Sequence, residues 1–319
     1  MRKLIIYLTL FTLITQISYS QQEAQFSHNM FNHMAINPGY AGIDGLICAT
    51  AIARTQWIGF KDPDNNKVAP QTLIFSINTP IKILRGGIGA SIIKDKLGFE
   101  NNIGLKLGYS YHLYGLGPGV LGIGAQVSFL NKAIDFSKFK PIDPTDPLLL
   151  SSKIEKDMIT DIMFGLYYNI PSKFYAGISS TQLLESKFDI GGQIAKPTLA
   201  RHYFMEAGYE YTFDNPDFEI LPSTLIKSDL ASTQFDLTCL MRYKSMAYGG
   251  LSYRNQDAIV VLVGYYPMKG LIGGISYDIT TSALGANKRS SGTFEAMVKY
   301  CFKIEVPYTP TSHHTVRFL

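Results

Sequence analysis

The feature that most constrains the fold is an alternation with a period of two residues, which begins near residue 46 and continues almost to the end of the chain. In one clear run, Ile103, Leu105, Leu107, Tyr109, Tyr111 and Leu113 lie on one face. Gly104, Lys106, Gly108, Ser110 and His112 lie on the other. Alternation of this kind indicates β-strands whose two faces meet different environments.

About fourteen such runs follow one another along the chain. They lie near residues 46–59, 70–79, 86–95, 101–114, 118–130, 157–170, 173–182, 200–213, 217–227, 231–243, 246–254, 257–266, 270–280 and 291–304. Every second connection is short and built from turn residues, such as Thr79-Pro80 and Asp214 to Asp217, whereas longer loops at 131–156, 183–199 and 281–290 lie among the others. An even strand number with short turns at one end and longer loops at the other is typical of outer-membrane barrels.

We therefore expect an all-β fold: a transmembrane outer-membrane β-barrel of about 14 antiparallel strands, preceded by a short N-terminal segment. A pair of soluble β-sandwiches is the alternative, because half-buried antiparallel strands also alternate. After residue 20 no apolar stretch is long enough for a transmembrane helix. A membrane-spanning chain of this sequence would therefore cross as strands.

The first twenty residues have the pattern of a secretory signal peptide. Arg2 and Lys3 precede an apolar run, and Ser18-Tyr19-Ser20 precede Gln21. We expect a signal peptide at 1–20, the N-terminal segment at 21–45, the barrel at 46–304 and a periplasmic tail at 305–319. The expected location is the outer membrane of a Gram-negative cell, with membrane lipid around the barrel.

Composition excludes several function classes. Without Arg2 and Lys3, the 29 basic residues fall to 27 against 25 acidic ones, too small an excess for nucleic-acid binding. The six His show no metal-ligand spacing, and no Ser or Cys is placed as a nucleophile, so we expect no metal, no cofactor and no enzyme activity. We interpret Cys48, Cys239 and Cys301 as small packing residues rather than a disulfide framework.

The faces opposite the apolar ones carry six basic and six acidic residues, which nearly cancel. They are Arg54, Lys106, Arg242, Arg254, Lys299, Lys303, Asp161, Glu206, Glu210, Asp236, Asp278 and Glu295. A selective ion pore needs rings of one sign, so we interpret these residues as a structural network of ion pairs in the lumen. A channel for small solutes remains the alternative.

The segment before the first strand resembles a known family. Its signature residues are Gln25, Phe26, Ser27, Met30, Phe31, Asn32, Asn37, Pro38, Gly39, Tyr40, Ala41 and Gly42, joined by Gln56 and Trp57. They resemble the opening of PorP/SprF type IX secretion system membrane proteins, and the similarity continues in Gly250 to Arg254 and in Ser291 to Glu295.

The resemblance implies a non-enzymatic outer-membrane component of the type IX secretion system. Its role would be export or cell-surface attachment of cargo proteins that carry C-terminal sorting domains, gliding or adhesin-type cargo among them. Expected partners are that cargo sorting domain and the periplasmic type IX subunits, and the alternative function is a small-solute porin. The signature segment is either a packing plug or a partner-docking element, and in the tail Arg317, Phe318 and Leu319 are a candidate contact with a periplasmic partner.

Overall fold

A computed structural model of the protein describes residues 23–62, 64–140, 153–190, 196–282 and 290–303. In these residues the fold consists of fifteen strands and a few short 3₁₀ turns. The strands are β1 (Ile47–Thr55), β2 (Gln71–Ile81), β3 (Gly86–Leu97), β4 (Glu100–Leu116), β5 (Gly119–Asp135), β6 (Ile154–Ile170), β7 (Phe174–Thr181), β8 (His202–Tyr209), β9 (Tyr211–Thr212), β10 (Phe218–Ser228), β11 (Thr233–Tyr243), β12 (Ala247–Arg254), β13 (Ala258–Met268), β14 (Leu271–Thr280) and β15 (Thr293–Phe302). Among these residues, no helix is long and apolar enough to cross a membrane.

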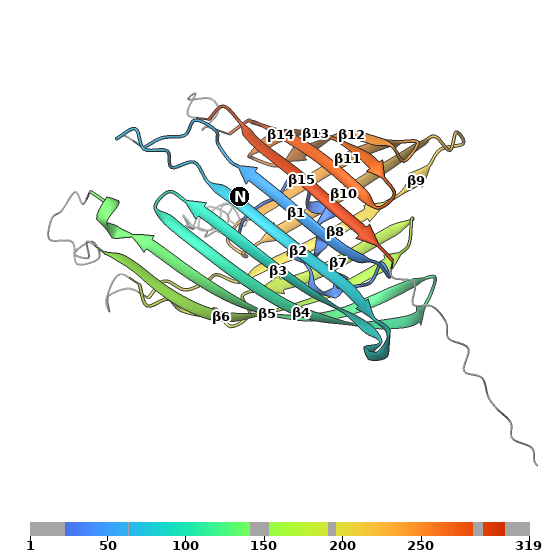
Figure 1. Cartoon of the computed structure of the whole chain (residues 1–319), viewed down its shortest axis with the longest axis horizontal. Helices are drawn as coiled ribbons and strands as arrows, with labels where there is room; N and C mark the ends of the chain where they lie inside the picture. The colour runs from blue at the N-terminus through green and yellow to red at the C-terminus, as the bar shows by residue number, and fades with distance from the viewer. Residues whose placement is uncertain (1–22, 63, 141–152, 191–195, 283–289, 304–319) are drawn as a thin grey trace, which may run out of the picture.

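The strands form one closed antiparallel barrel (Figure 1). Except for β8 and β9, each strand pairs with its sequence neighbour, and β1 also pairs with β15, so that Ile47 lies opposite Phe302 and Thr55 opposite Phe294. Because β8 and β9 both pair with β10, they act as one interrupted strand. The barrel therefore has the 14 strands that the sequence predicts.

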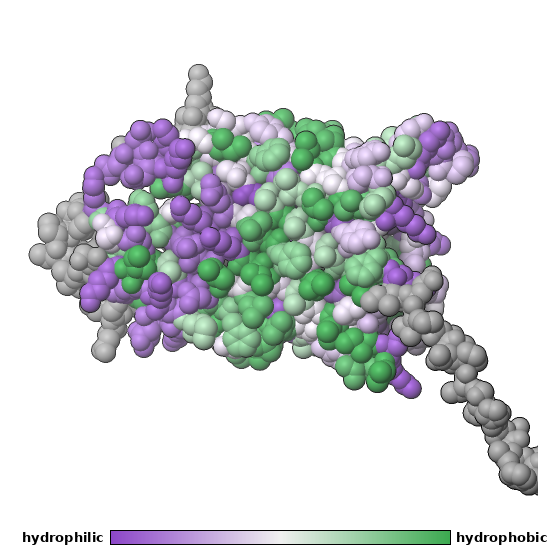
Figure 2. All heavy atoms as spheres, in the orientation of Figure 1, coloured by the Kyte–Doolittle hydropathy of each residue, from purple (hydrophilic) through white to green (hydrophobic). Residues whose placement is uncertain are grey.

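The apolar faces point outward, which excludes the sandwich alternative. In β2, Leu73, Phe75 and Ile77 are between 40 and 53% exposed, while Ser76 and Asn78 are buried. A soluble protein has the opposite arrangement, because its apolar side chains leave water. On the face that Figure 2 shows, apolar residues gather over the middle of the barrel, and hydrophilic residues gather at the end where β4, β5 and β6 extend furthest.

The two ends of the barrel differ, as the turn lengths predict. One end, here called the short-turn end, carries the connections at 82–85, 117–118, 171–173, 213–217, 244–246 and 269–270. The other, the long-loop end, carries the connections at 56–70, 136–153, 182–201 and 281–292 together with three short ones. Both Ile47 and Phe302 lie at the short-turn end, next to each other in the β1–β15 ladder.

The prediction that the cysteines only pack is wrong for two of them. Cys48 of β1 and Cys301 of β15 form a disulfide across the strand pair that closes the barrel. They are 253 positions apart, and only barrel closure brings them into register. Cys239, on the outer face of β11, is a free thiol. Cys239 and Cys301 lie on opposite faces of the wall.

Candidate functional site

The signature segment before β1 lies inside the barrel. We call residues 23–45 the lumen segment; it contains the 3₁₀ turns η1 (Asn29–Phe31), η2 (His33–Ala35) and η3 (Pro38–Tyr40). Its residues contact strands all around the wall, among them β2, β5, β6, β14 and β15. The described residues of the lumen segment therefore pack against the inner wall, and a role in docking a partner stays a prediction.

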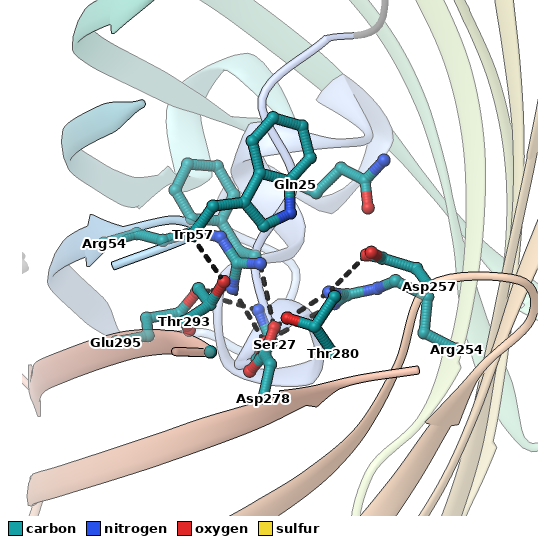
Figure 3. A network of polar contacts seen from close by, with 12 residues as sticks. Gln25, Ser27, Arg54, Trp57, Arg254, Asp257, Asp278, Thr280, Thr293 and Glu295 are labelled. Atoms are coloured by element: carbon teal, nitrogen blue, oxygen red, sulfur yellow. Dashed lines mark hydrogen bonds and ion pairs between the residues drawn. The ribbon is translucent and has the colours of Figure 1, made fainter. Parts of the chain in front are cut away.

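The end of the lumen segment nearer the long loops is held by one buried carboxylate (Figure 3). Glu295 of β15 accepts hydrogen bonds from the backbone N–H groups of Ser27 and His28, both at 2.8 Å, and lies 2.7 Å from His28 Nδ1. Its side chain is fully buried. One wall residue therefore satisfies two backbone donors and one ring nitrogen of the lumen segment.

Two arginines complete this buried network. Arg54 of β1 donates to Ser27 Oγ at 2.9 Å, to Glu295 at 3.1 Å and to Asp278 at 2.8 Å. Arg254 of β12 bonds Asp278 at 3.0 Å and Asp236 at 3.1 Å. Charges taken out of water are tolerated only when they are paired and hydrogen-bonded. These contacts bear out the predicted network of structural ion pairs in the interior. The pairs join wall strands to one another and contact Ser27 of the lumen segment; they do not cross an empty lumen.

The middle of the lumen segment is held by a histidine and a lysine. His33 Nδ1 lies 2.7 Å from Glu206 of β8, and its ring packs against Tyr40, Tyr167 and Tyr175 at centroid distances of 4.7 to 5.4 Å. Lys299 of β15 donates to the carbonyl of Phe31 at 3.0 Å. Two more of the charged positions predicted to face the lumen thus bind this segment.

At the short-turn end, the Asn-Pro-Gly-Tyr turn is bonded to the wall through main-chain groups. Asn37 caps η3 by accepting from Gly39 N at 2.9 Å, and it donates to Leu166 O of β6 at 3.0 Å. Ser110 donates to Gly39 O at 2.8 Å. His112 Nε2 lies 2.9 Å from Ala41 O, and Gly42 N donates to Asn78. An irregular backbone inside a barrel needs such partners, because unpaired buried N–H and C=O groups are costly.

Apolar signature residues fill three patches of the lumen wall. Phe26 packs with Ile52, Ile74 and Met297. Met30 and Phe31 lie against the cluster of Leu240, Tyr248, Val260 and Leu262. Met34, Tyr40 and Ala41 pack with Tyr167. The lumen is therefore a packed interior along the lumen segment, with polar anchors between apolar contacts.

Wall glycines let the lumen segment approach the strands closely. A Cβ added at Gly124 would lie 2.3 Å from Gly39 N, and one at Gly165 would lie 2.2 Å from Asn37 Oδ1. A Cβ added at Gly87 would likewise lie 2.3 Å from Ala41 O, and one at Gly89 would lie 2.3 Å from Met34 Cε. Sequence reasoning missed this role, although glycines on the lumen face of successive strands are its signal.

We predict that Gly165→Val lowers the free energy of unfolding by about 1–3 kcal/mol, because the added side chain overlaps the Asn37 turn. The measurement is urea unfolding of the purified barrel in detergent. Gly273→Val is the matched control, since a Cβ there meets nothing within 4 Å. Equal loss of stability in the two variants would contradict close packing at Gly165.

A second element enters the lumen from the long-loop end. In the connection between β7 and β8, Leu184 N and Ser186 N donate to Asp161 of β6, and Phe188, Ile190 and Leu199 pack on Ile159. The sequence predicts only an outer loop here. The observed loop folds inward because Asp161 and Ile159 lie on the lumen face of β6 and offer both polar and apolar partners.

The remaining candidate residues lie elsewhere. Gln56 and Trp57 follow β1 at the long-loop rim, where Gln56 N donates to Pro70 O and Trp57 N donates to Thr293 Oγ1. They do not contact the Asn-Pro-Gly-Tyr turn. The tail residues Arg317, Phe318 and Leu319 lie outside the described residues, as does the signal-peptide region 1–20. Within the described ranges, no group of three or more His, Cys, Asp or Glu could hold a metal ion.

Comparison with known families identifies the chain. The family model described as type IX secretion system membrane protein PorP/SprF matches residues 18–300. The chain belongs to the PorP/SprF family. This membership makes it a membrane component of the type IX secretion system, and its barrel fold supports an outer-membrane location. No curated protein matches the sequence significantly.

Solved structures similar to this PorP/SprF barrel are outer-membrane proteins of low identity. Omp33 of Acinetobacter baumannii is 9% identical with a TM-score of 0.45, covering 82% of this chain and 100% of Omp33. The Ralstonia pickettii toluene transporter TbuX is 11% identical with a TM-score of 0.47, covering 86% and 94%. The CymD monoaromatic hydrocarbon channel is 10% identical with a TM-score of 0.49, covering 87% and 94%. These identities transfer no ligand or activity to the chain.

Proposed function

We propose that this PorP/SprF barrel is a non-enzymatic component that supports export or surface attachment of cargo proteins with C-terminal sorting domains. The observation that carries the proposal is the family match over residues 18–300, nearly the whole chain. Cargo of the gliding or adhesin type is one class that fits. Cargo sorting domains and periplasmic type IX subunits are the partners we infer.

The filled lumen favours partner binding at the ends of the barrel over conduction. The family signature is used inside the molecule: Ser27, Asn37 and Gly39 bond to wall strands. Short turns face the periplasm and long loops face outward in barrels of this type. We infer that orientation here, with periplasmic subunits at the short-turn end and cargo at the long-loop end. A contact of Arg317, Phe318 and Leu319 with a periplasmic subunit stays a prediction.

An export assay tests the proposal. Cells lacking the gene are compared with cells that carry it on a plasmid, and the amount of sorting-domain cargo on the surface is measured by protease accessibility and immunoblotting. We expect surface cargo to fall severalfold in the deletion strain and to return with the plasmid, while total cargo synthesis is unchanged. Normal surface cargo in the deletion strain would overturn the proposal.

The alternative, a porin for small solutes, predicts a different electrical behaviour. Because the lumen segment and the β7–β8 loop are packed into the lumen, we expect the purified wild-type barrel to give no large, steady single-channel current in planar bilayers. A general porin reconstituted in parallel is the positive control. A large and steady current from the intact chain would favour the porin.

A further inference from the structure

The outward face of the barrel wall carries its charged side chains in one small area. On the outward faces of the described strands, nearly all side chains are apolar, small or uncharged. The charged ones are Lys94 and Lys96 of β3, Asp135 of β5 and Lys156 of β6. Asp135 pairs with Lys138 at 3.3 Å, so the charge that remains on this face is positive. All of it lies at the long-loop end of β3 to β6, where Figure 2 shows hydrophilic side chains.

Lys94 lies where the apolar surface ends. Its outward neighbours across the two ladders are Leu73 of β2 and Ile103 of β4, which are 53 and 49% exposed. Lys96 lies in the next outward row toward the long loops. Its neighbours in that row are both amide side chains, Gln71 and Asn101. Exposed apolar side chains on a barrel wall face lipid chains, so the edge of the hydrocarbon layer falls between these two rows.

Elsewhere around the barrel, the same edge is built from rings and aliphatic side chains. At the long-loop end of β8 and of β11 to β15, the outward side chains are Tyr203, Phe235, Tyr253, Ile259, Tyr277, Ile279 and Phe294. Aromatic rings are the usual anchors of a barrel at the membrane interface. Anchoring alone therefore does not require two lysines on β3, and their position calls for a specific partner.

Both lysines are exposed, and within the described part of the chain neither forms a hydrogen bond or an ion pair. The acidic side chains nearest to them in the sheet point into the lumen and bond there. Asp95 accepts from Thr72 at 2.6 Å, and Glu100 pairs with Lys132 at 2.7 Å. A lysine at a membrane interface lays its apolar stem along the hydrocarbon edge and holds its ammonium group among the headgroups.

The molecule that lies against this surface is a lipid. Because Leu73 and Ile103 face lipid chains, the headgroup of the same lipid lies just beyond them, beside Lys94 and Lys96. The two lysines are two residues apart on one face, roughly 7 Å along the strand. Both ammonium groups can therefore reach the oxygens of one phosphate, an anion that lysine binds as a point charge.

We propose that Lys94 and Lys96 bind the phosphorylated headgroup of a glycolipid in the outer leaflet of the membrane. This assignment depends on the proposed function only through the orientation of the barrel, with the long loops outside. In that orientation the leaflet beside the two lysines is the outer one, whose glycolipids carry phosphate. Free phosphate would be held less well, because it lacks the acyl chains that contact Leu73 and Ile103.

The test measures binding of lipid A, extracted from outer membranes of the same cells, to the full chain in a nonionic detergent by native mass spectrometry. One lysine beside an anionic lipid surface strengthens binding about fivefold. We therefore expect Lys94→Gln with Lys96→Gln to weaken binding about twentyfold, and added salt to weaken binding to the wild-type chain. Binding by this double variant as tight as that of the wild type would overturn the proposal.

Two further variants check charge and fold. Lys94→Arg with Lys96→Arg keeps both charges, so binding should stay within about threefold of the wild type. Lys187→Gln with Lys196→Gln is the matched control, because it removes two charges at the same end, from the connection between β7 and β8. It should weaken binding less than about threefold. Unboiled gels check that each variant forms a folded barrel. Equal weakening by the control pair would contradict a site on β3.

The lipid itself supplies the second comparison. Lipid A from which the phosphate has been removed keeps its acyl chains, so the wild type and the Lys94→Gln, Lys96→Gln variant should bind it equally. Inorganic phosphate at the same concentration should not displace lipid A. Displacement by inorganic phosphate, or an equal loss of binding for the lipid without phosphate, would overturn a headgroup site.

These outcomes are separate from those of the export assay. If surface cargo depends on the gene but the two lysines do not affect lipid A binding, the lipid site fails and the export role stands. If the lysine variant loses lipid A but surface cargo does not depend on the gene, the export role fails and the lipid site stands.

Discussion

Glu295→Ala is expected to lower the free energy of unfolding of the barrel by about 3–5 kcal/mol and to loosen the lumen segment. The carboxylate accepts from Ser27 N, His28 N and Arg54, and it contacts His28 Nδ1. Its removal leaves two backbone donors unsatisfied and Arg54 with Asp278 as its remaining acidic partner. Urea unfolding in detergent measures the loss, and protease cleavage within residues 23–45 reports the loosening.

Glu100→Ala is the matched control for this prediction. Glu100 also forms an ion pair, with Lys132 at 2.7 Å, but both side chains lie at the long-loop rim and are partly exposed. Because solvent screens such pairs, the expected loss is below about 1 kcal/mol. If Glu295→Ala were no more destabilising than Glu100→Ala, the buried network would not be what holds the lumen segment.

Replacing both Cys48 and Cys301 by serine is expected to destabilise the barrel by about 2–4 kcal/mol. The bond joins the first and last strands, so it restricts nearly the whole unfolded chain. The measurement is the temperature at which the folded band on a gel is replaced by the unfolded band, with and without reductant.

The cysteine prediction has an internal control in the third thiol. Cys239→Ser should leave the transition temperature unchanged, because that residue is exposed and unbonded. Reductant should lower the temperature for the wild-type chain and have no effect on the double variant. If reductant left the transition temperature of the wild-type chain unchanged, the β1–β15 strand pair would be stable without its disulfide.

The strands could be predicted from the sequence because lipid outside and a packed lumen inside impose a two-residue period. All fourteen predicted runs overlap observed strands, and the predicted lumen face of Arg54, Arg254, Asp278 and Glu295 is observed. These features depend on local alternation, which a linear sequence records directly.

The features that could not be predicted from the sequence depend on closure of the barrel. Cys48 meets Cys301 only because β1 pairs with β15, and Gly165 meets Asn37 only because the N-terminal segment enters the lumen. The spacing of these residues along the chain does not tell which residue each of them meets. The inward β7–β8 loop likewise depends on Asp161 and Ile159, whose partners lie 23 residues or more away.

If the family signature fills the lumen, partners and cargo must bind the barrel at its ends. Met34 tests the filled lumen most directly, because its side chain is 1% exposed, makes no hydrogen bond and contacts Gly89 within the wall. The measurement is the rate at which a membrane-impermeant maleimide labels Met34→Cys in outer membranes, in a Cys239→Ser background. Asp64→Cys in an outer loop is the exposed reference. We predict labelling of Met34→Cys at least about a hundredfold slower than that of Asp64→Cys; labelling at a similar rate would contradict a filled lumen.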